Sequence, residues 1–270
     1  MGISRIEESF VGVPGGSVFV RTWTPDKVST SSPMFLLHDS LGSVELWRDF
    51  PHELAHRLSR PIIAYDRLGF GKSTPRSGLP SASFVSEEAD VFFPAVRTAL
   101  GITRFSLFGH SVGGAMALMI AAAQTTDCDF VVTESAQAFV EQRTLAGILA
   151  GKEQFSCPEQ FSRLIRWHGD RAKWVLDAWT EVWLSPAFAS WNLDPHLGKV
   201  RCPVLAIHGD LDEYGSLAFP TRIVQGVQGP SRLAILERCG HVPHREHQDQ
   251  VLDLVSCFMA KPYATSASVT

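Results

Sequence analysis

The sequence has little cysteine, no long apolar run and no cluster of positive charge. Its five cysteines are scattered over 270 residues without a C-x-x-C spacing, which argues against a disulfide framework and a zinc site. No apolar run approaches the roughly 20 residues that span a bilayer. No run of lysine and arginine favours binding to nucleic acid. We therefore expect neither a membrane nor a nucleic acid as a partner.

The composition is that of a soluble globular protein. Hydrophobic residues make up 45% of the chain and charged residues 19%, and the formal net charge is -4. Residues 1–10 include Glu7 and Glu8 and lack the basic and apolar segments of a signal peptide. We expect a cytoplasmic monomer or homodimer whose partner is a small-molecule substrate.

What the sequence does contain is a Gly-x-Ser-x-Gly motif in an informative setting. An apolar strand pattern over residues 105–109 leads into Gly109-His110-Ser111-Val112-Gly113, and a small, apolar helix pattern follows. A serine between strand and helix lies at the apex of a strained turn, where a base can reach its hydroxyl. Side chains in place of the two glycines would collide with the neighbouring strand and helix. We interpret Ser111 as the nucleophile of a serine hydrolase.

Apolar strand patterns alternate with helix patterns along most of the chain. After a predicted hairpin over residues 7–23, short apolar runs stand at 34–38, 61–65, 105–109, 130–134, 204–208 and 233–236. Helix patterns stand between and after them, at 44–59, 84–100, 112–124 and 247–260. This alternation predicts an α/β fold in which a mostly parallel sheet is covered by helices on both faces.

The alternation breaks between residues 136 and 199. This stretch has helix-like patterns and five of the seven tryptophans of the chain. We predict a helical cap over residues 136–199, inserted between two parts of an α/β core at 1–135 and 200–270. A single cap tryptophan is more often part of the cap's own core, but some should line an apolar cavity under the cap. As the residues that contact the substrate we expect Trp183, Trp179, Phe139 and His244.

A serine hydroxyl is a weak nucleophile, so it needs a base that an acid holds in place. In a strand, turn and helix of this kind the three residues follow in the order Ser, Asp or Glu, His. The loop after residues 204–208 offers three candidate acids, Asp210, Asp212 and Glu213. The loop after residues 233–236 offers His241, which follows a glycine, and its rival His244.

With these motifs the chain resembles the alpha/beta hydrolase superfamily over nearly its whole length, and its local style is similar to that of bacterial hydrolases with a lid. The resemblance rests on the segments FLLHDSLGS from Phe35, DRLGFGKS from Asp66, GHSVG from Gly109, GDLD from Gly209 and GH from Gly240.

The resemblance implies an eight-stranded, mostly parallel sheet and assigns the remaining site residues. It selects Asp212 over Asp210 as the acid, because the family's acid stands three residues after the loop glycine, and His241 as the base. The N–H groups of Ser40 and Val112 match the oxyanion hole. The chain departs from the family at Asp39, where a glycine often stands, and this brings a negative charge close to the oxyanion.

We expect hydrolysis of a carboxylic ester or lactone of a small-to-medium apolar or aromatic substrate, through an acyl-serine intermediate. A carbon–carbon bond hydrolase or a thioesterase would use the same triad, and a non-catalytic receptor is a further alternative. No His, Cys, Asp or Glu cluster has metal-ligand spacing, and no nicotinamide or flavin fingerprint is present. We therefore expect no metal and no cofactor.

Overall fold

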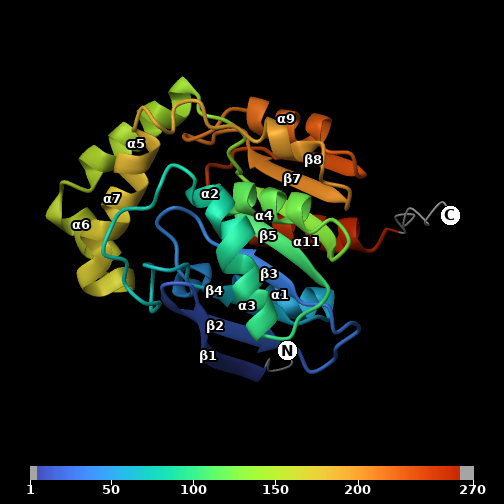
Figure 1. The fold of residues 1–270 in the computed structure, drawn as a ribbon. Helices are drawn as coiled ribbons and strands as arrows, with labels where there is room; N and C mark the ends of the chain where they lie inside the picture. The colour runs from blue at the N-terminus through green and yellow to red at the C-terminus, as the bar shows by residue number, and fades with distance from the viewer. Residues whose placement is uncertain (1–4, 262–270) are drawn as a thin grey trace.

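A single twisted sheet of eight strands forms the centre of the computed structural model, which describes residues 5–261 (Figure 1). The strands are β1 (Arg5–Val13), β2 (Gly16–Thr24), β3 (Met34–Leu37), β4 (Ile62–Tyr65), β5 (Phe105–His110), β6 (Cys128–Glu134), β7 (Val204–Gly209) and β8 (Ser231–Leu236). Their order across the sheet is β1-β2-β4-β3-β5-β6-β7-β8. Strand β2 is antiparallel to β1 and β4, and all other neighbours are parallel. The prediction of an eight-stranded, mostly parallel sheet is confirmed.

The central strands are buried on both faces because helices cover the sheet on both sides. In β3, Phe35 and Leu37 pack on one side and Met34 and Leu36 on the other, as the alternation of side chains along a strand requires. The helices and helical turns of the core are a 3-10 turn (Val44–Trp47), α1 (Phe50–Leu58), α2 (Phe84–Glu87), a π-helical turn (Glu88–Phe92), α3 (Phe93–Ala99), α4 (Val112–Ala123), α9 (Ala218–Gly226), α10 (Pro243–Glu246) and α11 (Gln248–Met259). Helices α3, α4 and α9 pack with the Phe35 side of the sheet, and α1 and α11 with the Leu36 side.

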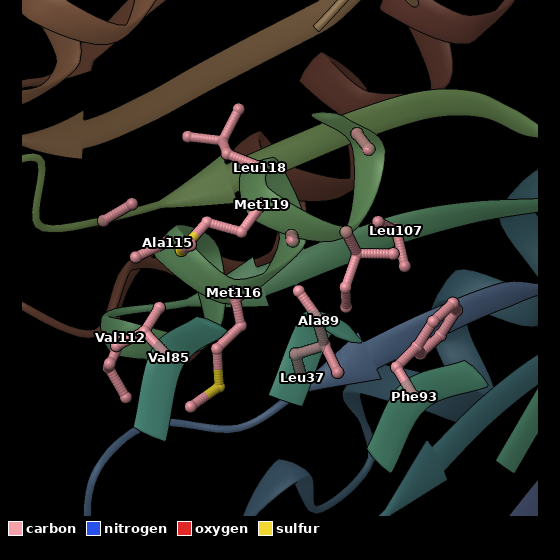
Figure 2. Packing of buried hydrophobic residues seen from close by; sticks show 14 of the residues in the cluster. Leu37, Val85, Ala89, Phe93, Leu107, Val112, Ala115, Met116, Leu118 and Met119 are labelled. Atoms are coloured by element: carbon pink, nitrogen blue, oxygen red, sulfur yellow. The ribbon is translucent and has the colours of Figure 1, made fainter. Parts of the chain in front are cut away.

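Helix α4 is apolar on all sides because it is enclosed on all sides. Every residue from Val112 to Ala122 is buried. Figure 2 shows Met116 on the side of α4 that faces Val85 and Ala89 of the neighbouring helical segments. The helix that begins directly after Ser111 is therefore fixed by packing along its whole length.

The predicted helix over residues 84–100 contains an irregularity that the pattern did not indicate. The N–H of Phe93 donates to the carbonyl of Glu88, five residues earlier, so the middle of the segment is a π-helical turn. Pro94 follows at once and has no N–H to continue the regular ladder. One extra residue is accommodated here without ending the helix.

The cap is built from α5 (Gln142–Gln154), α6 (Pro158–His168) and α7 (Ala172–Trp183), followed by the short α8 (Asp194–Leu197). In Figure 1, α5, α6 and α7 stand together beside the sheet, apart from the helices that cover its faces. Helix α5 is tied to the loop after β7, because the Thr144 hydroxyl donates to the Tyr214 carbonyl at 2.7 Å. Helix α6 is tied to the loop after β4, because His168 Nδ1 accepts the Gly71 N–H at 3.1 Å. These helices thus bridge two loops at the carboxyl ends of the parallel strands.

None of the helices in residues 5–261 is long and apolar enough to cross a membrane.

Candidate active site

Ser111 lies on a sharp turn between β5 and α4, in a backbone conformation that only glycine adopts without strain. Its φ is 56° and its ψ is −126°. The flanking glycines make this turn possible. A Cβ on Gly109 would lie 2.2 Å from the Gly113 carbonyl oxygen, and one on Gly113 would lie 2.1 Å from the Leu37 carbonyl oxygen. The steric role inferred for both glycines is confirmed.

Ser111, His241 and Asp212 come together in a line of hydrogen bonds. His241 Nε2 lies 3.0 Å from Ser111 Oγ, and His241 Nδ1 lies 2.9 Å from each carboxylate oxygen of Asp212. All three side chains are buried. These distances suit a nucleophile, a base and an acid that fixes the tautomer of the base.

The structure also shows which of the two carboxylates, Asp212 or Asp210, contacts His241. Asp212 is 1% exposed, and its Oδ1 accepts the backbone N–H groups of Tyr214 and Gly215 at 2.8 and 3.1 Å. Asp210 is exposed and accepts the backbone N–H of Cys239 at 3.2 Å. The carboxylate that contacts His241 is therefore that of Asp212, in agreement with the choice made from the resemblance.

The charges around His241 favour its protonated form. Burial of the ring opposes protonation, but the charge and hydrogen bond of Asp212, with the charges of Glu213 and Asp39, raise the pKa of His241 above its ordinary value. Burial also opposes the charged form of Asp212, yet the charge and N–H of His241 hold the pKa of its carboxyl below the ordinary value. The pair is thus arranged to stabilise an imidazolium once His241 has accepted a proton.

Three contacts fix the loop that carries His241. Glu246 accepts the N–H groups of Gly240 and Val242 at 2.7 and 3.0 Å, on either side of the histidine. His110 Nε2 lies 2.8 Å from the His241 carbonyl oxygen and donates to it. His110 is buried and also positions the main chain of His241.

The peptide that joins Asp39 to Ser40 is held from its carbonyl side. The Asp39 oxygen accepts hydrogen bonds from Arg67 Nη2 at 2.6 Å and from His38 Nδ1 at 2.8 Å. Because a trans peptide is planar, these bonds also set the direction of the Ser40 N–H. Val112 is the first residue of α4, and amides in the first turn of a helix have no partner within it. The assignment of both N–H groups to an oxyanion hole stays a prediction.

A cavity of about 230 Å³ opens beside Ser111 under the cap. Its lining residues are Asp39, Ser40, Leu41, Ser111, Gln137, Thr144, Ile148, Trp179, Trp183, Glu213, Tyr214, His241 and Val242. Of the residues expected to contact the substrate, Trp179 and Trp183 are in this lining and Phe139 and His244 are not.

Phe139 and His244 are occupied elsewhere, so their expected places in the cavity are corrected. The Phe139 ring packs edge-on against Phe219 of α9, with centroids 4.8 Å apart. His244 is buried, and its Nδ1 lies 2.5 Å from Glu134 Oε2 at the end of β6. Both residues follow strands that end at this edge of the sheet, and both were expected in the cavity. Phe139 instead packs against α9, and His244 contacts the end of β6.

His244, Glu134 and His110 bring three possible ligand atoms within 4.8 Å of one another. Two ligands of one tetrahedral zinc ion would lie about 3.3 Å apart, given bonds of about 2.0 Å. The 2.5 Å between His244 Nδ1 and Glu134 Oε2 is instead a direct hydrogen-bond contact between the two side chains. The geometry favours a buried hydrogen-bonded pair over a metal centre.

Gln137 is a site residue that the sequence reasoning missed. It is 5% exposed, and its Nε2 lies 3.1 Å from Ser111 Oγ. Its only signal in the sequence is that it follows the strand ending at Glu134, at the same sheet edge as Ser111. The sequence does not show in which direction a polar side chain in a loop points, and only the folded loop shows that this one reaches Ser111.

Comparison with known proteins agrees with this fold. The sequence profile of the Alpha/beta hydrolase family matches residues 34–254. Over 101 residues the chain is 34% identical to a proline iminopeptidase of Lactiplantibacillus plantarum, an alignment that covers 35% of this chain and 32% of that protein. The chain thus spans about a third of the length of such curated relatives.

Two solved structures illustrate the likeness in fold. The 2-hydroxy-6-oxo-6-phenylhexa-2,4-dienoate hydrolase of Rhodococcus sp. strain RHA1 superposes with a TM-score of 0.77 at 19% identity, covering 96% of this chain and 100% of that chain. A carboxylesterase of Bacillus subtilis gives 0.70 at 18% identity, covering 95% and 92%. At such identities the likeness shows the fold and leaves the reaction open.

Proposed function

The chain belongs to the alpha/beta hydrolase family, and we propose that it is a serine hydrolase that cleaves a carboxylic ester or lactone. The observation that carries this proposal is the line of contacts from Asp212 through His241 to Ser111, which ends in a cavity lined by Trp179 and Trp183. Such a cavity suits a small-to-medium substrate with an apolar or aromatic part.

In the first half-reaction Ser111 becomes acylated. His241 Nε2 takes the hydroxyl proton while Ser111 Oγ attacks the carbonyl carbon, and the carbonyl electron pair moves onto the oxygen. Asp212 stabilises the imidazolium, and the N–H groups of Ser40 and Val112 donate to the oxyanion. When the carbonyl re-forms, the bond to the leaving oxygen breaks and His241 gives its proton to that oxygen.

In the second half-reaction water releases the acid. His241, neutral again, takes a proton from a water molecule whose oxygen attacks the acyl carbon. The tetrahedral intermediate collapses, the bond from the acyl carbon to Ser111 Oγ breaks, and His241 returns the proton to Oγ. The products are a carboxylic acid and an alcohol, or a hydroxy acid when the substrate is a lactone.

The alternatives that use the same triad differ in what the cavity must bind. A thioester on a phosphate-bearing carrier would favour basic side chains, and among the described residues that line the cavity none is lysine or arginine. This favours an ester over such a thioester. A substrate panel decides between ester and amide hydrolysis.

The decisive experiment compares Ser111→Ala with a matched control, Ser162→Ala, which changes an exposed serine of cap helix α6. We expect the wild-type protein and the control to hydrolyse 4-nitrophenyl butyrate and to react with a fluorophosphonate probe. Ser111→Ala should do neither, and His241→Ala should lose labelling. Unchanged turnover in Ser111→Ala would refute the proposal, and a wild-type protein that is not labelled would favour a non-catalytic receptor.

A panel of matched acetyl, butyryl and phenylacetyl compounds then separates the bond types. Each acyl group is offered as an ester, a thioester and an amide, together with a simple lactone. We expect kcat/KM to be highest for esters or lactones and higher for phenylacetyl than for acetyl. A preference for the amides would assign the protein to the peptidases instead.

A further inference from the structure

We infer that the cavity beside Ser111 selects substrates that carry a positive charge, such as a protonated amine or a quaternary ammonium group. The inference rests on the proposed function, because it assigns the charge of the substrate that reaches Ser111. Apart from His241, the charged residues in the cavity lining are Asp39 and Glu213. No lysine or arginine is found among the described residues of that lining.

Both carboxylates act on the groups that face the cavity. Their charges favour the protonated form of His241, as described above. Burial, with the charges of Glu213, Asp39 and Asp212, raises the pKa of the Tyr214 hydroxyl to about 12. The rings of His241 and Tyr214, whose centroids lie 4.8 Å apart, therefore experience the same negative potential.

Three arginines lie close to this cavity but are not part of its lining. Arg67 Nη2 donates to the Asp39 main-chain oxygen at 2.6 Å, and its guanidinium lies 4.4 Å from the centre of the Phe70 ring. Arg143 Nη1 donates to the Asp212 main-chain oxygen at 3.1 Å. Arg245 lines a separate, smaller cavity that shares Asp39 and Val242 with the cavity beside Ser111. These arginines moderate the negative charge but do not line the cavity beside Ser111, although Arg67 lines a small cavity that shares Ser40, Trp179 and Trp183 with it.

The lining of the cavity is also rich in aromatic rings. Trp179, Trp183 and Tyr214 line the cavity, and the rings of Trp179 and Tyr214 pack edge-on with centroids 5.8 Å apart. Aromatic faces attract ammonium groups and offer no comparable attraction to a carboxylate. Rings and carboxylates thus favour the same ligand, an organic cation, and the carboxylates repel an organic anion. The acid released by hydrolysis would be repelled as well, which favours its departure.

The test measures binding to the wild-type protein with three ligands of similar size: phenyltrimethylammonium, acetophenone and benzoate. Quenching of tryptophan fluorescence reports binding next to Trp179 and Trp183. We expect the Kd of the cation to be at least roughly tenfold below that of benzoate. Equal or tighter binding of benzoate would overturn the inference.

Variants then test whether Asp39 and Glu213 cause the preference for the cation. Asp39→Asn keeps the oxygen that accepts the Leu41 N–H, and Glu213→Gln changes an exposed side chain, so both remove charge at nearly constant shape. In the double variant the preference for the cation should fall to within about threefold of benzoate. The matched control Glu153→Gln, on the exposed side of cap helix α5, should retain the wild-type ratio. An unchanged ratio in the double variant would overturn the inference.

Competition kinetics separate this inference from the proposed function. Phenyltrimethylammonium should inhibit hydrolysis of 4-nitrophenyl butyrate competitively, which places the cation next to Ser111; inhibition that is not competitive contradicts this placement. If the wild-type protein hydrolyses no ester, the proposed function fails, and the binding ratio still decides the charge preference of the cavity. If esters are hydrolysed but the ratio is near one, the inference alone fails.

Discussion

Replacing Asp212 by asparagine tests the catalytic assignment most directly, because the side chain keeps its size and loses its charge. Two backbone N–H groups hold Oδ1, so an asparagine keeps its oxygen there and places its NH2 group where Oδ2 was. That position is 2.9 Å from His241 Nδ1. An NH2 group there donates to Nδ1 and favours the tautomer that carries its proton on Nε2, which cannot accept the proton of Ser111.

The loss of charge adds to the loss of the correct tautomer. A unit charge about 4 Å from the imidazolium is worth about 4 kcal/mol at an effective dielectric constant of about 20. This corresponds to about a 10³-fold loss of rate, and serine proteases lose about 10⁴-fold on the same type of change. We expect kcat/KM of Asp212→Asn to fall by about 10³- to 10⁴-fold.

The matched control is Asp210→Asn, two residues earlier in the same loop. Its side chain is exposed, and an asparagine oxygen can still accept the N–H of Cys239. We expect its kcat/KM to stay within about twofold of the wild type, as for other surface changes. Hydrolysis of 4-nitrophenyl butyrate gives the rates, and circular dichroism checks the fold. A loss below tenfold in Asp212→Asn, or an equal loss in both variants, would refute the assignment.

Three further predictions follow from the same contacts. Since carboxylates raise the pKa of His241 and only its neutral ring accepts a proton, kcat/KM should rise with pH through a midpoint above 6.5; a lower midpoint contradicts this. His244→Ala leaves Glu134 buried without this partner. Unfolding in urea should show that the free energy of unfolding falls by about 3–5 kcal/mol. A loss below about 1 kcal/mol would show that the pair adds little stability. Gly113→Ala places a Cβ 2.1 Å from a backbone oxygen and should cost about 3 kcal/mol or more, whereas Gly78→Ala, with nothing within 4 Å of its Cβ, should leave the melting temperature unchanged.

The sheet and the order of the site residues could be predicted from the sequence because both depend on local patterns. Short apolar runs mark strands that are buried on both faces, and the runs at residues 105–109 and 204–208 correspond to β5 and β7. Parallel strands bring their carboxyl ends to one edge, so the loops after β5, β7 and β8 meet wherever the sheet forms. This rule brings Ser111 together with the loops after β7 and β8, whereas the choice of Asp212 and His241 within those loops came from the resemblance to the family.

The cavity lining could not be predicted in the same way, because it depends on where each side chain turns. Phe139 and Gln137 are two residues apart in the loop after β6, yet Gln137 contacts Ser111 and Phe139 packs against α9. A loop has no fixed period, so sequence spacing gives no alternation of faces there. His244 was misplaced for a related reason, since its partner Glu134 lies 110 residues away in the sequence.

Asp39 shows how a departure from the family's usual glycine fits into the oxyanion loop. Its Oδ1 accepts the N–H of Leu41 at 3.1 Å, so the carboxylate folds back onto its own loop. Its main-chain oxygen is held by Arg67 and His38, and this fixes the peptide whose N–H belongs to Ser40. Donation to a carbonyl oxygen also polarises the N–H of the same peptide. In the function proposed above, the side chain would add negative charge to the cavity while the main chain keeps the N–H that is assigned to the oxyanion, so that the same residue would serve both substrate charge selection and catalysis.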